Sequence, residues 1–110
     1  MKETVHMNHR LIEKCLEGDI KAQYQIYKQY SKAMYNIAVR FLDNKMDAED
    51  ILQESFVTAF TRMDELKNKH VFGSWLKRIV INNCISLQRK RKVRFEEIDE
   101  ERHGGVETQD

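Results

Sequence analysis

The complete absence of proline constrains the fold of this chain more than any other feature. No proline occurs in its 110 residues. Average usage of about 5% would supply roughly five, and proline breaks a helix because it lacks a backbone donor and clashes with the preceding turn. A chain of this length forms one domain with a modest core of its own. We therefore expect an all-α fold, a compact bundle of about four helices.

Apolar residues in steps of three and four indicate where the first two helices lie. The first runs from Asn8 to Leu16, and Gly18 ends it in a left-handed conformation. The second begins after Asp19, a good N-cap, and continues for more than 20 residues. Its predicted inward positions are Ile20, Tyr24, Tyr27, Tyr30, Met34, Ile37 and Phe41.

The same spacing predicts two further helices. One begins at Asp47, with Asp50 as an aspartate version of a capping box. It buries Leu52, Phe56, Ala59 or Phe60, and Met63. The other starts near Phe72 and runs into the basic sequence RKRK, with inward positions at Trp75, Leu76, Ile79, Val80, Asn83 and Leu87. Residues 1–94 thus form the helical domain, and residues 95–110, with a Gly-Gly pair and little to bury, read as an acidic flexible tail.

Charge is strongly segregated along the chain, although the net charge is only +1. Residues 43–65 carry seven acids against two bases, and residues 66–94 carry nine bases and no acid. From residue 95 onward seven acids face one arginine. The three blocks indicate separate partners, an autoinhibitory pairing of the basic block with the acidic tail, or clustering on a solvated surface.

The sequence offers no evidence for catalysis, a cofactor or a metal site. The four histidines, at positions 6, 9, 70 and 103, form no convergent set, and glycine-rich phosphate loops and nucleophile elbows are absent. Cys15 and Cys84 lie far apart within helical patterns, which favours buried reduced thiols over a disulfide or a metal pair. We expect a protein that is not an enzyme.

No apolar run reaches the roughly 20 residues needed to cross a bilayer. The N-terminal sequence MKETVHMNHR also lacks the apolar segment of a signal peptide. We therefore expect a cytoplasmic protein without membrane insertion.

The decapeptide DAEDILQESF, residues 47–56, combines a helix start with an unusual acidic surface. Acids in a first helical turn offset the positive end of the helix dipole. With Leu52 and Phe56 inward, however, Asp50, Gln53 and Glu54 lie on the opposite surface, where the last two gain nothing from the dipole. This stripe suits a positively charged partner.

A second stripe lies on the helix that follows Phe72. Its members recur in steps of three and four: Arg78, Asn82, Ser86 and Arg89. Arginine can contact phosphates and asparagine can contact base edges. This face therefore has the chemistry both to bind nucleic acid non-specifically and to recognise part of its sequence.

The decapeptide, followed at residues 72–82 by FGSWLKRIVIN and then by a short basic stretch, resembles region 2 of the extracytoplasmic-function (ECF) branch of bacterial sigma factors. The family text is close to DAEDLVQEVF and FxxWLxRIAxN, and the match covers roughly residues 9–94. The resemblance implies a transcription initiation domain that binds core RNA polymerase and recognises and helps melt the promoter minus-10 element. An anti-sigma factor is a further partner common in this branch.

The resemblance also implies roles for individual residues. Asp50, Gln53 and Glu54 would dock on the clamp helices of the largest polymerase subunit. Arg78 and Asn82 match the motif that reads the minus-10 element, and the loop at residues 66–72 would hold a flipped base. The other residues expected to contact DNA are Lys67, Lys69, Ser86, Arg89 and Arg91.

Two departures from the family pattern stand out. Ser86 replaces an aspartate common eleven residues after Trp75, and the helix-turn-helix of region 4 does not follow Asp110. Because the chain stops inside linker-like sequence, an excised domain is favoured over a natural fragment.

We expect Trp75 to pack in the core or at a hinge rather than stack on a base. The alternative function is a helical protein-interaction module without sequence-specific DNA binding.

Overall fold

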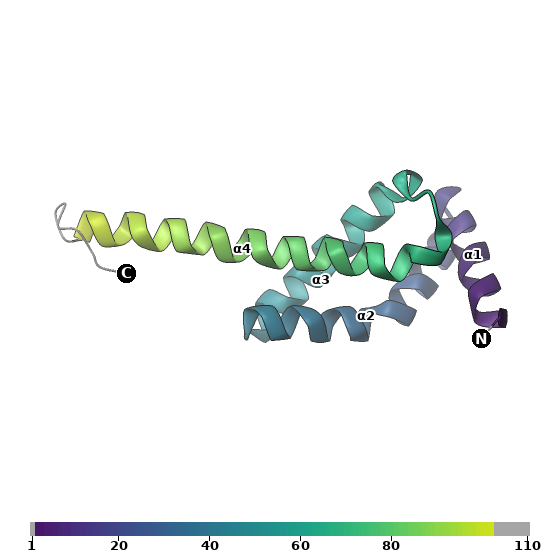
Figure 1. The fold of residues 1–110 in the computed structure, drawn as a ribbon, viewed down its shortest axis with the longest axis horizontal. Coiled ribbons are helices and arrows are strands. Elements are labelled where there is room, and N and C mark those ends of the chain that lie inside the picture. The colour runs from purple at the N-terminus through teal and green to yellow at the C-terminus, as the bar shows by residue number, and fades with distance from the viewer. Residues whose placement is uncertain (1, 103–110) are drawn as a thin grey trace.

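The computed structural model describes the backbone of residues 2–102 and the side chains of residues 8–98. Within this range the chain is helical and contains no strand, which confirms the predicted all-α bundle of four helices (Figure 1). The helices are α1 (Lys2–Leu16), α2 (Ile20–Leu42), α3 (Lys45–Thr61) and α4 (Phe72–Arg102). Two short 3-10 turns, η1 (Met63–Glu65) and η2 (Lys69–Val71), precede α4.

The turn between α1 and α2 forms as the sequence predicts. Gly18 has a φ of 88°, the left-handed region in which glycine carries no side-chain penalty. A side-chain oxygen of Asp19 accepts a hydrogen bond of 2.9 Å from the Lys21 N–H, which caps α2. Helix α1 begins six residues before Asn8, however, because the apolar pattern marks the part of a helix that packs rather than its full length.

The buried face of α2 differs from the prediction. Ile20, Tyr24 and Phe41 are 77%, 61% and 38% exposed, so their predicted inward positions are wrong. Met34 is buried as predicted, and Ala22, Ile26 and Ala38, which were not predicted to face inward, join it in the core at steps of four or twice four. Small alanines let the neighbouring helices approach closely, while Tyr27, Tyr30 and Ile37 pack half-buried at the sides.

Helices α3 and α4 and the turn η1 supply most of the remaining core, and α1 adds Ile12 and Cys15. The predicted inward positions of α3 and η1 are confirmed. Leu52, Phe56, Ala59 and Met63 are buried. From α4, Leu76, Val80 and Cys84 are buried, and Trp75 packs half-buried with its ring centroid 5.9 Å from that of Phe72, which confirms its packing role. Cys15 and Cys84 are buried free thiols, also as predicted.

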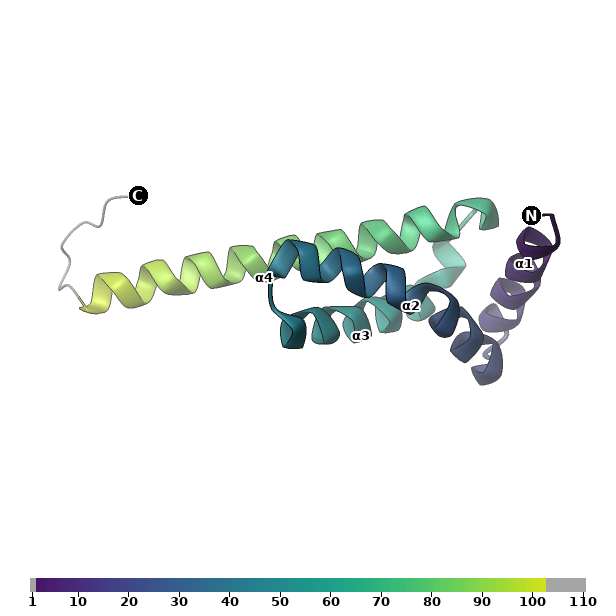
Figure 2. The ribbon, with the colours of Figure 1, turned by 90° about the horizontal axis from the view of Figure 1, so that it is seen from below.

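Helix α4 crosses the bundle and extends well beyond it, at the end opposite to α1 (Figures 1 and 2). The molecule is accordingly elongated, with extents of 61 × 22 × 21 Å. Residues 95–102 of the predicted tail continue α4 as a helix, because they contain neither glycine nor proline and are rich in glutamate, a good helix former. Side chains 95–98 are exposed, which agrees with a segment that has little to bury. The remaining predicted tail, residues 103–110, lies outside the described residues.

Candidate protein and nucleic-acid interfaces

The acidic stripe of α3 lies on the surface. Asp50, Gln53 and Glu54 are exposed, as is Val57, whose exposed fraction is 65%. Helix α3 begins two residues earlier than predicted, because Asn44 is its N-cap and accepts a hydrogen bond of 3.0 Å from the Asp47 N–H. The predicted Asp47–Asp50 capping pair is therefore wrong, although Asp47 does lie in the first turn.

A groove beside this stripe brings α2 into the candidate protein interface. It has a volume of about 700 Å³ and is lined by Tyr27, Ser31, Lys32, Tyr35, Glu49, Asp50, Leu52 and Gln53. The Gln53 Nε2 amide donates a hydrogen bond of 2.9 Å to the Tyr27 hydroxyl, and the Tyr27 ring lies edge-on to Phe56. Sequence reasoning missed the α2 residues because it placed Tyr27 in the core.

The second stripe is confirmed as one exposed face of α4. Arg78, Asn82, Ser86 and Arg89 are all exposed, on the side of the helix away from the buried residues. Among the described side chains, none of the four takes part in an ion pair. The two arginines are therefore available to an external anion, with an amide and a hydroxyl between them.

The loop before α4 is braced by α1, a contact that the sequence did not reveal. Lys67 is exposed, but the Lys69 ammonium lies 3.6 Å from the Glu13 carboxylate. The rings of His9 and His70 meet edge to face, with their centroids 4.3 Å apart. Part of the predicted base-holding loop is thus held against α1.

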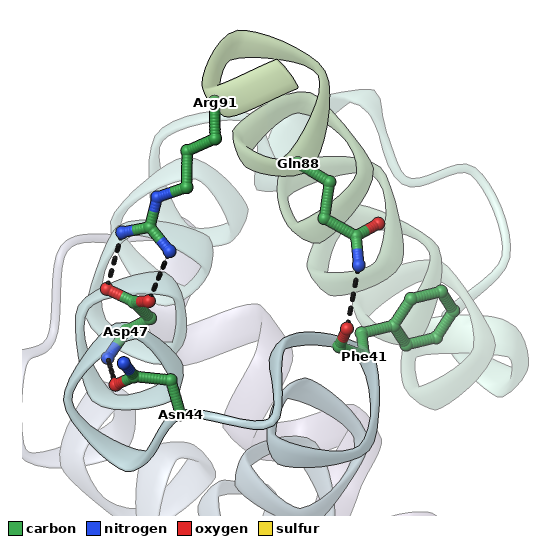
Figure 3. A network of polar contacts seen from close by, with 5 residues as sticks. All are labelled: Phe41, Asn44, Asp47, Gln88 and Arg91. Carbon is green, nitrogen blue, oxygen red and sulfur yellow. Dashed lines mark hydrogen bonds and ion pairs between the residues drawn. The ribbon is translucent and has the colours of Figure 1, made fainter. Parts of the chain in front are cut away.

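Arg91 lies apart from the other predicted DNA-binding residues of α4. At about 100° per residue, it is about 200° around the helix from Arg89, on the side that faces the bundle. Its guanidinium forms a two-pronged ion pair with Asp47, and the Nη2 to Oδ1 distance is 2.8 Å (Figure 3). This hydrogen-bonded partner holds the pKa of the Asp47 carboxyl below its ordinary value.

Two kinds of site are absent from the described part of the chain. No group of three or more histidine, cysteine, aspartate or glutamate side chains is arranged there to hold a metal ion. Nor is any helix within residues 2–102 both long and apolar enough to cross a membrane.

Comparison with known proteins identifies relatives of this chain. The ECF RNA polymerase sigma factor SigW of Bacillus subtilis is 35% identical over 86 residues, which are 78% of this chain and 46% of that protein. The RNA polymerase sigma-H factor of Pseudomonas aeruginosa is 29% identical over 81 residues, 74% of this chain and 42% of that protein. The ECF RNA polymerase sigma-E factor of Haemophilus influenzae is 29% identical over 84 residues.

The chain spans less than half the length of these relatives: 46%, 42% and 44%. The family model for sigma-70 region 2 matches residues 26–94, which include both stripes. The match begins inside α2 and ends at Arg94 of α4, so it covers α3 and the core-facing part of α4, whereas α1 with its core residues Ile12 and Cys15 lies outside it. The predicted resemblance is confirmed, and the chain belongs to the sigma-70 region 2 family.

Proposed function

We propose that this chain is the region 2 domain of an ECF sigma factor, which binds core RNA polymerase and recognises and helps melt the promoter minus-10 element. Family membership supports the proposal, and one structural observation carries it. Arg78, Asn82 and Arg89 lie on the same exposed face of α4, and no acidic residue lies between them in the sequence. The acidic stripe belongs to another helix, so the two partners need not compete.

The DNA face would combine two kinds of contact. Arg78 and Arg89 would bind phosphates, while Asn82 would read a base edge. Lys67 would approach from the loop, and Lys69 would do so by exchanging its contact with Glu13 for a phosphate. Unpairing a base costs a few kcal/mol, which contacts to the single strand must offset. The exposed lysine and arginine side chains are suited to this task because strand phosphates lie along both sides of an opened base.

The polymerase face would consist of Asp50, Gln53 and Glu54. Its carboxylates suit a basic protein surface, and the groove beside them adds the tyrosine and lysine side chains of α2. We further propose that the chain acts in the cytoplasm as a binding domain rather than an enzyme, and that an anti-sigma factor regulates it.

The DNA proposal is tested by measuring binding to single-stranded oligonucleotides in which each base of a candidate minus-10 element is varied. Replacing Asn82 with alanine should relax the sequence preference more than it lowers overall affinity. Asn36, an exposed asparagine of α2, is the matched control, and its replacement should change neither. A wild-type chain without base preference would favour the interaction-module alternative. A base preference that Asn82→Ala keeps would instead show that Asn82 does not read the base.

The polymerase proposal has a separate test, in which core polymerase is captured with tagged domain. Glu54→Lys should weaken capture because it reverses a charge on the exposed stripe without touching the core. Glu17→Lys reverses an exposed charge at the end of α1, outside both stripes, and should have no effect. Equal capture of the two variants would count against the polymerase face.

A further inference from the structure

Three elements meet at a polar contact where α4 leaves the bundle (Figure 3). From α4, the Gln88 amide donates a hydrogen bond of 2.7 Å to the Phe41 carbonyl at the end of α2. One turn later Arg91 reaches Asp47, whose own N–H is bonded to the Asn44 side chain. The contact therefore ties α4 to the α2–α3 turn and to the first turn of α3.

Among the residues whose side chains the structure describes, 8–98, this contact is the last attachment of α4 to another helix. Leu87 is the last half-buried residue of the helix, and side chains 88–98 are all exposed. Beyond Leu87, the described side chains form no other hydrogen bond or ion pair with another helix. A helical segment without tertiary contacts is marginal in water. The contacts of Gln88 and Arg91 therefore hold in place the basic turn, which we define as residues 89–94.

Asp47 and Arg91 differ from the nearby charged residues of α3 and α4 in exposure and in direction. The Asp47 side chain is only 15% exposed, whereas Asp50 and Glu54 are exposed on the open surface. Arg91 faces the bundle, whereas Arg89 faces outward. A bidentate arginine–carboxylate pair fixes orientation as well as distance.

We propose that Asp47 and Arg91 are positioning residues, which keep the basic turn helical and Arg89 aligned with Arg78, and that Arg91 itself does not contact DNA. This inference rests on the proposed DNA-binding function. According to this inference, Arg91 is not one of the DNA-binding residues. Asp47 is likewise not one of the carboxylates of the acidic decapeptide that contact a partner. The pair thereby joins the first turn of the polymerase-facing helix to the DNA-facing helix.

The test uses the whole chain and a fluorescently labelled single-stranded minus-10 oligonucleotide, titrated at several salt concentrations. Arg91→Gln and Asp47→Asn should each lower affinity several-fold and should have the same salt slope as each other, and the double variant should be no worse than either single one. Arg89→Gln, the matched control, should reduce the slope by about 0.7, the value for one lost phosphate contact on a single strand. If Arg91→Gln reduces the slope by this amount while Asp47→Asn leaves it unchanged, Arg91 contacts DNA and the inference is overturned. Stronger binding by Asp47→Asn would also overturn it, since Asp47 would then be masking Arg91.

Amide hydrogen exchange without DNA provides a readout that is independent of the proposed function. Exchange at residues 89–94 should be faster in Arg91→Gln and Asp47→Asn and unchanged in Arg89→Gln. Unchanged exchange in the first two variants would contradict the positioning role. A wild-type chain that binds no oligonucleotide would instead overturn the proposed function, while the exchange comparison would still decide whether the pair orders the basic turn.

Discussion

The side-chain amide of Gln53 donates a hydrogen bond of 2.9 Å to the hydroxyl of Tyr27, so that α2 holds in place a residue of the acidic stripe on α3. The Tyr27 ring is itself fixed edge-on against Phe56, with the centroids 4.8 Å apart. A long side chain held in this way loses less conformational freedom when a partner binds. The hydrogen bond thus links the packing of α2 to the proposed polymerase face.

Removal of the Tyr27 hydroxyl should weaken polymerase binding without disturbing the core. Tyr27→Phe keeps the ring but frees Gln53, and ordering such a side chain costs roughly 0.5–1.5 kcal/mol, about 2–10-fold in affinity. Tyr24→Phe is the control, because Tyr24 is 61% exposed and lies outside the groove. Equilibrium binding to core polymerase measures both. Equal affinities would show that Gln53 needs no support from α2.

The buried contact between α3 and α4 should matter for stability. Ser55 is fully buried, and the Asn83 amide donates a hydrogen bond of 3.0 Å to its hydroxyl. Asn83→Ala leaves the hydroxyl without this donor, which should cost about 1–3 kcal/mol in the free energy of unfolding, measured in urea. Asn82→Ala, one residue away on the exposed face, should cost little. If both variants unfold at the same urea concentration, the hydrogen bond is not a significant source of stability.

Salt should weaken DNA binding in proportion to the phosphate contacts. For single strands, the logarithm of affinity should fall by about 0.7 per contact per log unit of salt. Lys67→Gln should therefore flatten the dependence by about that amount, because Lys67 is exposed in the loop. Lys28→Gln, an exposed change on α2, should leave it unaltered. A flat profile for the wild-type chain would reject electrostatic binding.

The thiol of Cys15 should make the fold sensitive to alkaline pH. Burial, assisted by the charge of Asp19, raises the pKa of this thiol from 9.0 to about 11. Because the folded value is the higher one, the contribution to stability is complete below pH 9 and is lost as pH rises toward 11. Urea unfolding at pH 8 and pH 10.5 should show a smaller loss for Cys15→Ala than for the wild type. An identical loss in both chains would contradict the assignment.

The helices were predictable because their signals are local. Gly18 and Asp19 determine the turn between α1 and α2 through their own backbone and side chains. Leu52 and Phe56 repeat at the spacing of one helix face, so the sequence identified α3 and its exposed stripe correctly. The face of α2 was not predictable in the same way. Tyrosine is apolar enough to suggest a core, and the tyrosine spacing selected a face that leaves out the buried Ile26. The two alanines that face the core, Ala22 and Ala38, carry almost no hydrophobic signal to correct this choice.

The candidate site was predictable in its composition but not in its contacts. The stripe from Arg78 to Arg89 follows from periodicity, and its exposure is confirmed. The pairing of Arg91 with Asp47 joins residues 44 positions apart, so no local pattern contains it. The same holds for Glu13 and Lys69, which meet only because α1 folds back beside the loop.

The uninterrupted course of α4 from Phe72 to Arg102 has a geometric consequence for its far end. Each residue of an α-helix advances the axis by 1.5 Å and turns it by about 100°. The direction in which the side chains at 95–98 point is therefore set by residue count from the stripe. A single inserted residue after Arg94 would rotate that end by more than a quarter of a circle while leaving the bundle untouched. The length of α4 therefore sets both the distance of its far end from the bundle and the direction in which the side chains there point.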